Sequence, residues 1–137
     1  MWDAKQDHLT PACRVEPESA EDVSTILKTT VEAGCHFAIK SGGHSMTAGS
    51  SNADGGVTVD LMRMNKATIE TNKKSVKIGA GARWKEVYEI VENENLMVIG
   101  GRVADVGVGG LLLGGKILVC LSKVPLTQSV RRDFILL

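Results

Sequence analysis

The sequence lacks an excess of charge, a set of paired cysteines and a long hydrophobic run, and each absence excludes a class of protein. Sixteen basic residues balance sixteen acidic ones, so bulk charge gives no basis for binding nucleic acid or an anionic membrane surface. The three cysteines, Cys13, Cys35 and Cys120, are far apart and provide neither a disulfide framework nor a paired zinc motif. The most apolar stretch, residues 106–121, contains Lys116 and is shorter than the roughly 20 residues of a membrane-spanning helix.

Length and composition indicate a single folded domain. The chain has 137 residues, of which 43% are hydrophobic and 23% charged, close to the averages of globular proteins. The first ten residues are polar and mixed in charge, unlike a signal peptide. We therefore expect a soluble protein without a membrane segment; its compartment does not follow from the sequence.

Glycine is the residue that the chain has in excess. There are 15 glycines among 137 residues, about 11% where roughly 7% is typical. Twelve of them lie in two windows, residues 42–56 and 100–115. Glycine-rich loops let several backbone N–H groups converge on an anion, usually a phosphate.

Capping residues and hydrophobic periodicity predict an α+β domain. Ser19 and Gly34 delimit a helix over residues 17–34. The other expected elements are a helix over 84–92 and strands over 36–39, 57–61, 75–78, 96–99 and 116–121. The apolar faces of the two helices comprise Val23, Ile26, Leu27 and Val31 in the first, and Trp84, Val87, Tyr88 and Val91 in the second. Both glycine-rich windows follow strands, which would place their amides at strand ends.

Two segments of the sequence resemble nucleotide-binding motifs, but each lacks a residue that its motif requires. Residues 110–116 match the phosphate-loop pattern GxxxxGK, but Ile117 stands where Ser or Thr must bind magnesium. Residues 107–110 begin like the dinucleotide-binding pattern GxGxxG, but Leu112 takes the place of the third glycine. A P-loop nucleotidase and a Rossmann site are therefore both disfavoured.

The segment Ser41 to Ser45 is the more informative loop. Its two glycines permit positive φ and a tight turn with several amides pointing inward, and Ser45 adds a hydroxyl donor. An anion-binding loop and a surface turn with an incidental histidine explain this spacing equally well. His44 has no partner at the spacing that zinc requires, so we expect no metal site.

Other residues near these loops also leave two interpretations open. Asp60, at the end of a predicted strand, is more simply explained as capping the following turn than as catalytic. Lys40 and Arg102 each adjoin a glycine loop and either neutralise a phosphate or remain solvated. We expect Trp84 and Tyr88, four residues apart, in the core rather than in a stacking platform.

Several motifs together resemble one family. They are residues 14–17 with 20–23, residues 40–45 (KSGGHS), residues 57–61 (VTVDL) and residues 100–115 (GGRVADVGVGGLLLGG). In this order they resemble the FAD-binding domain of berberine bridge enzyme-like oxidoreductases, most closely the fungal FAD-linked members. Vanillyl-alcohol oxidase and p-cresol methylhydroxylase (PCMH) share this domain type. The resemblance covers residues 7–115 and implies the N-terminal portion of an α+β, PCMH-type FAD-binding domain, which would be incomplete.

This resemblance implies that two loops contact the cofactor. The first would hold the FAD pyrophosphate, and His44 would form a covalent bond to the 8α-methyl carbon of the flavin, since a neutral imidazole nitrogen is a suitable nucleophile. The implied cofactor-binding residues are Ser41, Gly42, Gly43, His44, Ser45 and Met46 in the first loop, and Gly101, Val106, Gly107, Gly109 and Gly110 in the second. Bicovalent relatives carry a cysteine where Val103 aligns, so only the single link is implied. The valine at 106 aligns with a position that influences oxygen access.

The implied function is that of an FAD-linked oxidoreductase. Hydride would pass from a small organic substrate, such as a secondary-metabolite intermediate, to FAD, and O2 would act as acceptor. No catalytic residue is assigned, because the family places its catalytic base in a substrate domain that this sequence does not show. The substrate is also unidentified.

The C-terminal residues depart from the resemblance. Lys116 interrupts the glycine pattern, and residues 116–137 show no similarity to the family. We expect residues 116–137 to be a divergent tail of the kind that readthrough into an intron or a frameshift would produce. The alternative function is therefore a truncated flavin-domain remnant without catalytic activity.

Overall fold

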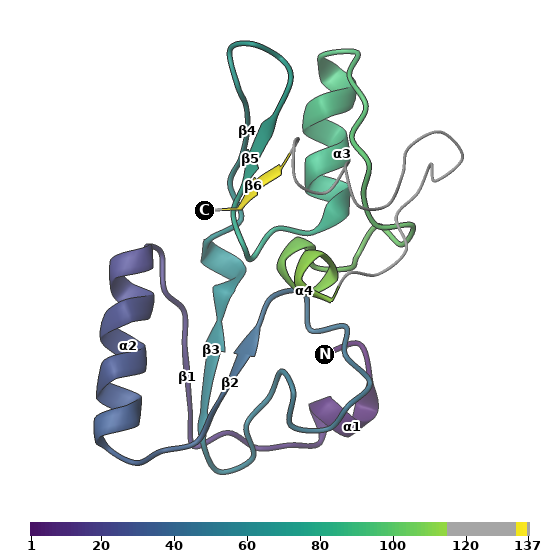
Figure 1. The fold of residues 1–137 in the computed structure, drawn as a ribbon. Helices are drawn as coiled ribbons and strands as arrows, with labels where there is room; N and C mark the ends of the chain where they lie inside the picture. Colours follow the sequence, from purple (N-terminus) through teal and green to yellow (C-terminus); the bar gives the residue numbers. More distant parts are fainter. Residues whose placement is uncertain (115–133, 137) are drawn as a thin grey trace.

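The computed structural model describes residues 1–114 and 134–136. Its strands form two sheets, and the helices lie beside them (Figure 1). The first sheet comprises β1 (Cys13–Val15), β3 (Val57–Asp60) and β2 (Phe37–Lys40), all parallel, in the order β1-β3-β2. The second has the order β4-β5-β6, with β4 (Ala67–Ile69) antiparallel to β5 (Val76–Ile78), and β6 (Phe134–Leu136) parallel to β5. Helices and strands are thus mixed, as the sequence predicts.

The helices connect and cover these strands. They are α1 (Ala4–Asp7), α2 (Ala20–Glu32), α3 (Trp84–Asn93) and α4 (Val108–Leu113), with a 3-10 turn, η1, at Leu61–Arg63. In Figure 1, α2 lies beside the first sheet, α3 beside the second, and α4 between the two groups. Within the described part, none of the helices is long and apolar enough to cross a membrane.

Helix α2 begins and ends where its sequence signals predict. Ser19 accepts a hydrogen bond from the Asp22 amide, and the Asp22 carboxylate accepts one from the Ser19 amide, which forms a capping box. Gly34 follows the helix with φ of +63°, a conformation that favours glycine. The predicted apolar face is only partly covered, since Val31 is 66% exposed.

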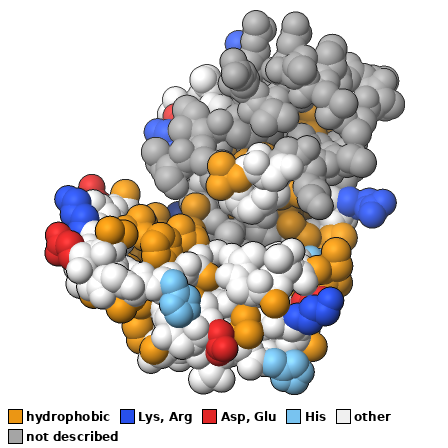
Figure 2. Space-filling model, turned by 60° about the horizontal axis from the view of Figure 1, so that its bottom comes forward, with side chains coloured by type: hydrophobic (Ala, Val, Ile, Leu, Met, Phe, Trp, Pro, Cys, Tyr) orange, Lys and Arg blue, Asp and Glu red, His pale blue; other side chains and the backbone are white. Residues whose placement is uncertain are grey.

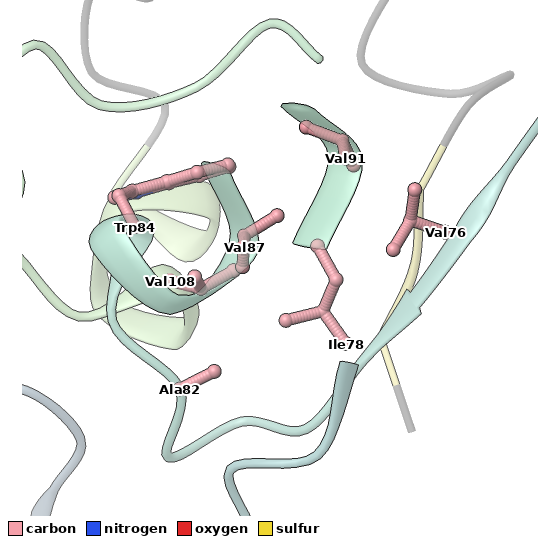
Figure 3. Close-up of a cluster of buried hydrophobic side chains, with 7 residues drawn as sticks. All are labelled: Val76, Ile78, Ala82, Trp84, Val87, Val91 and Val108. Atoms are coloured by element: carbon pink, nitrogen blue, oxygen red, sulfur yellow. The ribbon is translucent and has the colours of Figure 1, made fainter. Parts of the chain in front are cut away.

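The hydrophobic core lies between α3, α4 and the second sheet (Figure 3). Its buried side chains are Val76, Ile78, Ala82, Trp84, Val87, Val91 and Val108. The predicted apolar face of α3 is confirmed, because Trp84, Val87 and Val91 are buried and Tyr88 packs against them. The indole of Trp84 has no exposed surface, which confirms its prediction as a core residue.

Other local predictions were wrong or incomplete. Residues 96–99 form no strand: the Leu96 amide donates to Val91 O at the end of α3, and the side chains of Leu96 and Val98 pack on the core. Residues 108–113 form a helix instead of continuing the loop, and β4 was not predicted. The strand expected over residues 116–121 lies outside the described residues.

Candidate functional site

The two glycine-rich windows meet at Gly42 and Gly107. A Cβ atom built on Gly42 would lie 2.6 Å from the Cα atom of Gly107, and one built on Gly107 would lie 2.8 Å from the Cα atom of Gly42. Real Cβ atoms are almost never this close to backbone, so each glycine is required by the close approach of the other. The fold therefore brings together two loops that are 65 residues apart, at the junction of α4 with the end of β2.

Ser41 and the Ala80 carbonyl fix this junction. Ser41 Oγ donates to the carbonyl oxygen of Ala80 at 2.6 Å. That oxygen also lies against Gly109, where an added Cβ atom would be 2.8 Å away from it. Gly109 is buried, whereas Gly110 is exposed and has open space where a Cβ atom would be. Gly109 and Gly110 thus belong to α4, and only Gly109 packs against the first loop.

The first loop presents backbone amides without partners. Gly43 has φ of +66°, a turn that only glycine adopts readily. Within residues 1–114 and 134–136, the amides of Gly42 through Met46 donate to no other group. Successive amides in such a turn can bind an anion. This set of donors fits a pyrophosphate group.

His44 lies beside this turn with its imidazole stacked on the indole of Trp2. The ring centroids are 4.3 Å apart and the planes are inclined by 17°. Neither ring nitrogen of His44 has a hydrogen-bond partner in the described part of the chain. An imidazole nitrogen without a partner is available to act as a nucleophile.

The serine side of the loop is tied to α1 by a polar network. Ser45 Oγ accepts from the Thr47 amide at 3.2 Å and lies 2.7 Å from Ser50 Oγ. Ser50 Oγ in turn accepts from Gln6 Nε2 at 2.8 Å, and Gln6 Nε2 also donates to the Thr47 carbonyl. Gln6 is polar and completely buried. Its hydrogen bonds therefore connect the loop to α1.

Met46 is the most exposed member of the first loop. Its side chain is 64% exposed and carries no contact that assigns it a role. Its binding to the cofactor therefore rests on the motif.

Beneath the loop, a buried carboxylate holds the end of β2. Asp60 has no exposed surface; it accepts a hydrogen bond from Lys40 Nζ and forms an ion pair with Arg14 Nη2, both at 2.6 Å. Its other oxygen accepts from the Met62 amide at 3.1 Å, which confirms that Asp60 caps the following turn. Lys40 is therefore paired with Asp60 and largely buried, not a solvated charge. Arg102 is exposed and, in the described residues, forms no ion pair.

The second loop is packed against α3. Gly101 is buried, a Cβ atom on it would lie 2.5 Å from Trp84 Cδ1, and its carbonyl accepts from Tyr88 Oη at 2.7 Å. The Val106 carbonyl accepts from the Trp84 amide at 3.1 Å. Val103 is 47% exposed. This part of the loop is thus held by the start of α3, and among the described residues Val106, Gly107 and Gly109 lie against the first loop.

Asp105 anchors the same loop electrostatically. Lys85 Nζ lies 3.1 Å from its carboxylate and Arg83 Nη1 3.6 Å. The hydrogen bond and charge of Lys85, followed by the charge of Arg83, hold the pKa of Asp105 below its ordinary value. The carboxylate is exposed, so water weakens this attraction.

Three features of the site have no signal in the local sequence: the Trp2–His44 stack, the Gln6 network and the ion pair between Arg14 and Asp60. Each joins residues more than 40 positions apart, and no local spacing signals such a contact. No group of three or more His, Cys, Asp or Glu residues within the described ranges could hold a metal ion.

Comparison with protein families gives one match that covers most of the chain. Residues 11–122 match the family described as FAD binding domain. A FAD-dependent monooxygenase, FUP4 of Fusarium proliferatum (strain ET1), is 42% identical over 114 residues, which are 83% of this chain and 22% of that protein. The FAD-dependent monooxygenase drtC of Aspergillus calidoustus is 49% identical over 115 residues, 81% of this chain and 22% of that protein. The chain thus spans about a fifth of the length of these relatives.

Solved structures show the same fold. The chain superposes on 6-hydroxy-D-nicotine oxidase from Arthrobacter nicotinovorans with a TM-score of 0.74 and 27% identity, over 81% of this chain and 24% of that one. It superposes on glucooligosaccharide oxidase from Acremonium strictum, an enzyme with a 6-S-cysteinyl, 8α-N1-histidyl FAD, with a TM-score of 0.72 and 30% identity. That match covers 82% of this chain and 24% of the oxidase. These matches confirm the expected α+β fold of PCMH and vanillyl-alcohol oxidase type.

Proposed function

Because the chain belongs to the FAD binding domain family, we propose that it forms the FAD-binding part of an oxidoreductase of the berberine bridge enzyme-like type. The observation that carries this proposal is the junction of the two glycine-rich loops, where Gly42 and Gly107 touch and the amides of residues 42–46 donate to no group in the described part of the chain. FAD bound there would accept hydride from a C–H bond of a small organic substrate and pass the electrons to O2, giving hydrogen peroxide.

The chain's own residues would hold the cofactor at two points. The amides of Gly42 to Met46, with the hydroxyl group of Ser45, would donate hydrogen bonds to the pyrophosphate. Gly101, Val106, Gly107, Gly109 and Gly110 of the second window would contact the flavin side. Backbone donors suit this task because they are fixed before the anion arrives and require little reorganisation.

His44 would link the protein covalently to the 8α-carbon of the flavin. Two observations support this assignment: its ring nitrogens have no partner in the described residues, and a structural neighbour carries an 8α-histidyl FAD. That neighbour has a second link through cysteine, whereas the glycine motif of this chain would place Val103 at the corresponding position. We therefore propose a single link.

A second candidate is a flavin-binding chain without turnover of its own. Two observations favour it: the buried carboxylate of Asp60 is paired with two cations, and Phe37 and Ile39 leave an apolar strand surface exposed. The two candidates differ in one measurable property, peroxide formation from a C–H substrate, and they agree on binding FAD.

The covalent link is tested by supplying FAD to the apoprotein and precipitating with acid. Wild-type protein should remain yellow after precipitation, whereas His44→Ala should release all its flavin into the supernatant. His8→Ala is the matched control, because His8 is exposed and, among the described residues, its side chain forms no hydrogen bond or ring contact with the loop; it should retain the flavin. Complete release of flavin from the wild-type protein would contradict the link.

A further inference from the structure

We infer that Trp2 is a positioning residue for His44, holding the imidazole plane in the orientation needed to bond the flavin. This inference rests on the proposed attachment through His44. Trp2 was not singled out by any motif, and it lies 42 residues before the histidine that it contacts. The stack is close to parallel, with ring centroids 4.3 Å apart and an interplanar angle of 17°.

The backbone of Trp2 is itself fixed to the loop. Its amide donates to the carbonyl oxygen of Gly43 at 3.1 Å. The preceding residue is close to the same glycine, since a Cβ atom on Gly43 would lie 3.0 Å from Met1 Sδ. The indole therefore stacks on His44 from a backbone that is hydrogen-bonded to the adjacent residue, which restricts its position relative to the imidazole.

Helix α1 holds the same loop from the other side. The side-chain amide of Gln6 donates to the Thr47 carbonyl and to Ser50 Oγ. The main-chain carbonyl oxygen of Gln6 accepts from Asn52 Nδ2 at 2.8 Å. Trp2 and Gln6 thus form hydrogen bonds with Gly43 and Thr47, which lie on either side of His44 in the sequence. The fully buried Gln6 thus connects the short, four-residue α1 to this loop.

The geometry of the stack suits attachment and does not block it. A ring nitrogen forms its bond in the plane of the imidazole, whereas Trp2 occupies one face of the ring. In the attachment a C–N bond forms between a ring nitrogen and the 8α-carbon. The nitrogen and that carbon would each give up one proton, and the two electrons released would pass through the flavin to O2, which with the two protons would give hydrogen peroxide. Trp2 contributes only orientation, which limits rotation of the imidazole away from the carbon.

Trp2 can be changed without removing a core residue. Its side chain is 58% exposed, so little buried apolar surface is lost on truncation. The test uses Trp2→Ala, and Trp2→Phe as the conservative variant that retains a stacking ring, both in the full chain. Met97→Ala is the matched control, because Met97 is an 83% exposed apolar side chain outside both loops.

The first measurement separates attachment from binding. With FAD added to apoprotein, Trp2→Ala should form acid-stable flavin about tenfold more slowly, because small misplacements of a reacting group are costly. Its affinity for FAD before attachment, followed by flavin fluorescence quenching, should stay within about twofold of wild type, a free-energy change of about 0.4 kcal/mol. Trp2→Phe should recover most of the attachment rate, and Met97→Ala should match wild type.

The second measurement needs no cofactor. In the apoprotein the indole ring current should shift the NMR signals of the His44 ring protons upfield, with His44→Ala identifying them. Trp2→Ala should abolish this shift. A histidine that shows no such shift in wild-type protein would overturn the inference.

The outcomes distinguish the inference from the function on which it rests. If Trp2→Ala attaches flavin at the wild-type rate while His44→Ala attaches none, only the role of Trp2 is overturned. An equal loss of FAD affinity and attachment rate, or no recovery in Trp2→Phe, would also overturn it, because either would indicate general support of the loop. Wild-type protein without acid-stable flavin would overturn the attachment itself.

Discussion

At the scale of single residues, close approach and charge pairing decide what the site permits. Gly42 and Gly107 leave room for each other only because neither has a Cβ atom. Asp60 is completely buried, and its charge is balanced by Lys40 and Arg14. A buried carboxylate is tolerated when such partners satisfy it, so this residue supports the end of β2.

Replacing Gly107 by alanine tests the contact between the two loops. A methyl group there would lie 2.8 Å from the Cα atom of Gly42 and 2.6 Å from Ser41 Oγ. The loops must then separate, and we expect the free energy of unfolding to fall by about 1–3 kcal/mol and the affinity for FAD to fall about tenfold or more. Urea unfolding and flavin titration measure the two effects.

Gly110→Ala is the control for this substitution. Gly110 lies inside α4 with open space around it, so the added methyl group meets nothing. Because alanine favours the helix over glycine by roughly 1 kcal/mol, the variant should unfold at an equal or higher urea concentration. Equal destabilisation by both substitutions would show that the loop contact is not responsible.

At the scale of elements, α2 depends on its first turn. The Asp22 carboxylate accepts from the amides of Glu18 and Ser19, both at 3.0 Å, and these hydrogen bonds hold the pKa of Asp22 below its ordinary value of 3.8. Because the pKa of Asp22 is lower in the folded state than in the unfolded state, its charged carboxylate stabilises the folded state at every pH above the unfolded-state pKa. This stabilisation is lost as the pH falls through the lower, folded value.

The pH dependence of the Asp22→Asn variant tests this capping. At neutral pH the variant should be less stable than wild type, and the difference should shrink as the pH is lowered below 3.8. Urea unfolding of both proteins across this range measures it. Asp54→Asn serves as the control, because among the residues that the structure describes its exposed carboxylate accepts only from the Thr10 amide at 3.0 Å, a bond that the asparagine oxygen can replace. A difference for Asp22 that is constant with pH would contradict the prediction.

At the scale of the whole molecule, the first sheet leaves apolar surface uncovered. Phe37 and Ile39 point to the same side of β2 because they are two residues apart, and they are 39% and 44% exposed. Within the described residues β2 pairs only with β3 and forms an edge of its sheet. In the view of Figure 2, hydrophobic side chains are exposed in several places, and charges of both signs are scattered among them.

Exposed apolar side chains on an edge strand promote association between chains. We expect the 137-residue chain to bind a hydrophobic dye and to self-associate as its concentration rises, as measured by light scattering. Changing both Phe37→Ser and Ile39→Thr should reduce both signals. Met97→Thr, which removes an exposed apolar residue from elsewhere, should leave them unchanged. A monodisperse wild-type chain without dye binding would contradict this prediction.

The sequence by itself determined the features that depend on neighbours along the chain. Ser19 and Gly34 set the ends of α2, and the 3.6-residue spacing set the buried face of α3, because caps and periodicity act within a few residues. The order of the glycine motifs likewise identified the FAD-binding fold, which the comparisons confirm. The cofactor contacts of individual residues remain predictions.

Only the tertiary structure decided the features that depend on distant partners. The contact of Gly42 with Gly107, the pairing of Lys40 with Asp60 and the stacking of Trp2 on His44 all join segments that lie apart in the chain. The same reason explains the wrong strand at residues 96–99: a strand exists only where another strand completes its hydrogen bonds. Local sequence sets which conformations are favourable, but packing sets which groups meet.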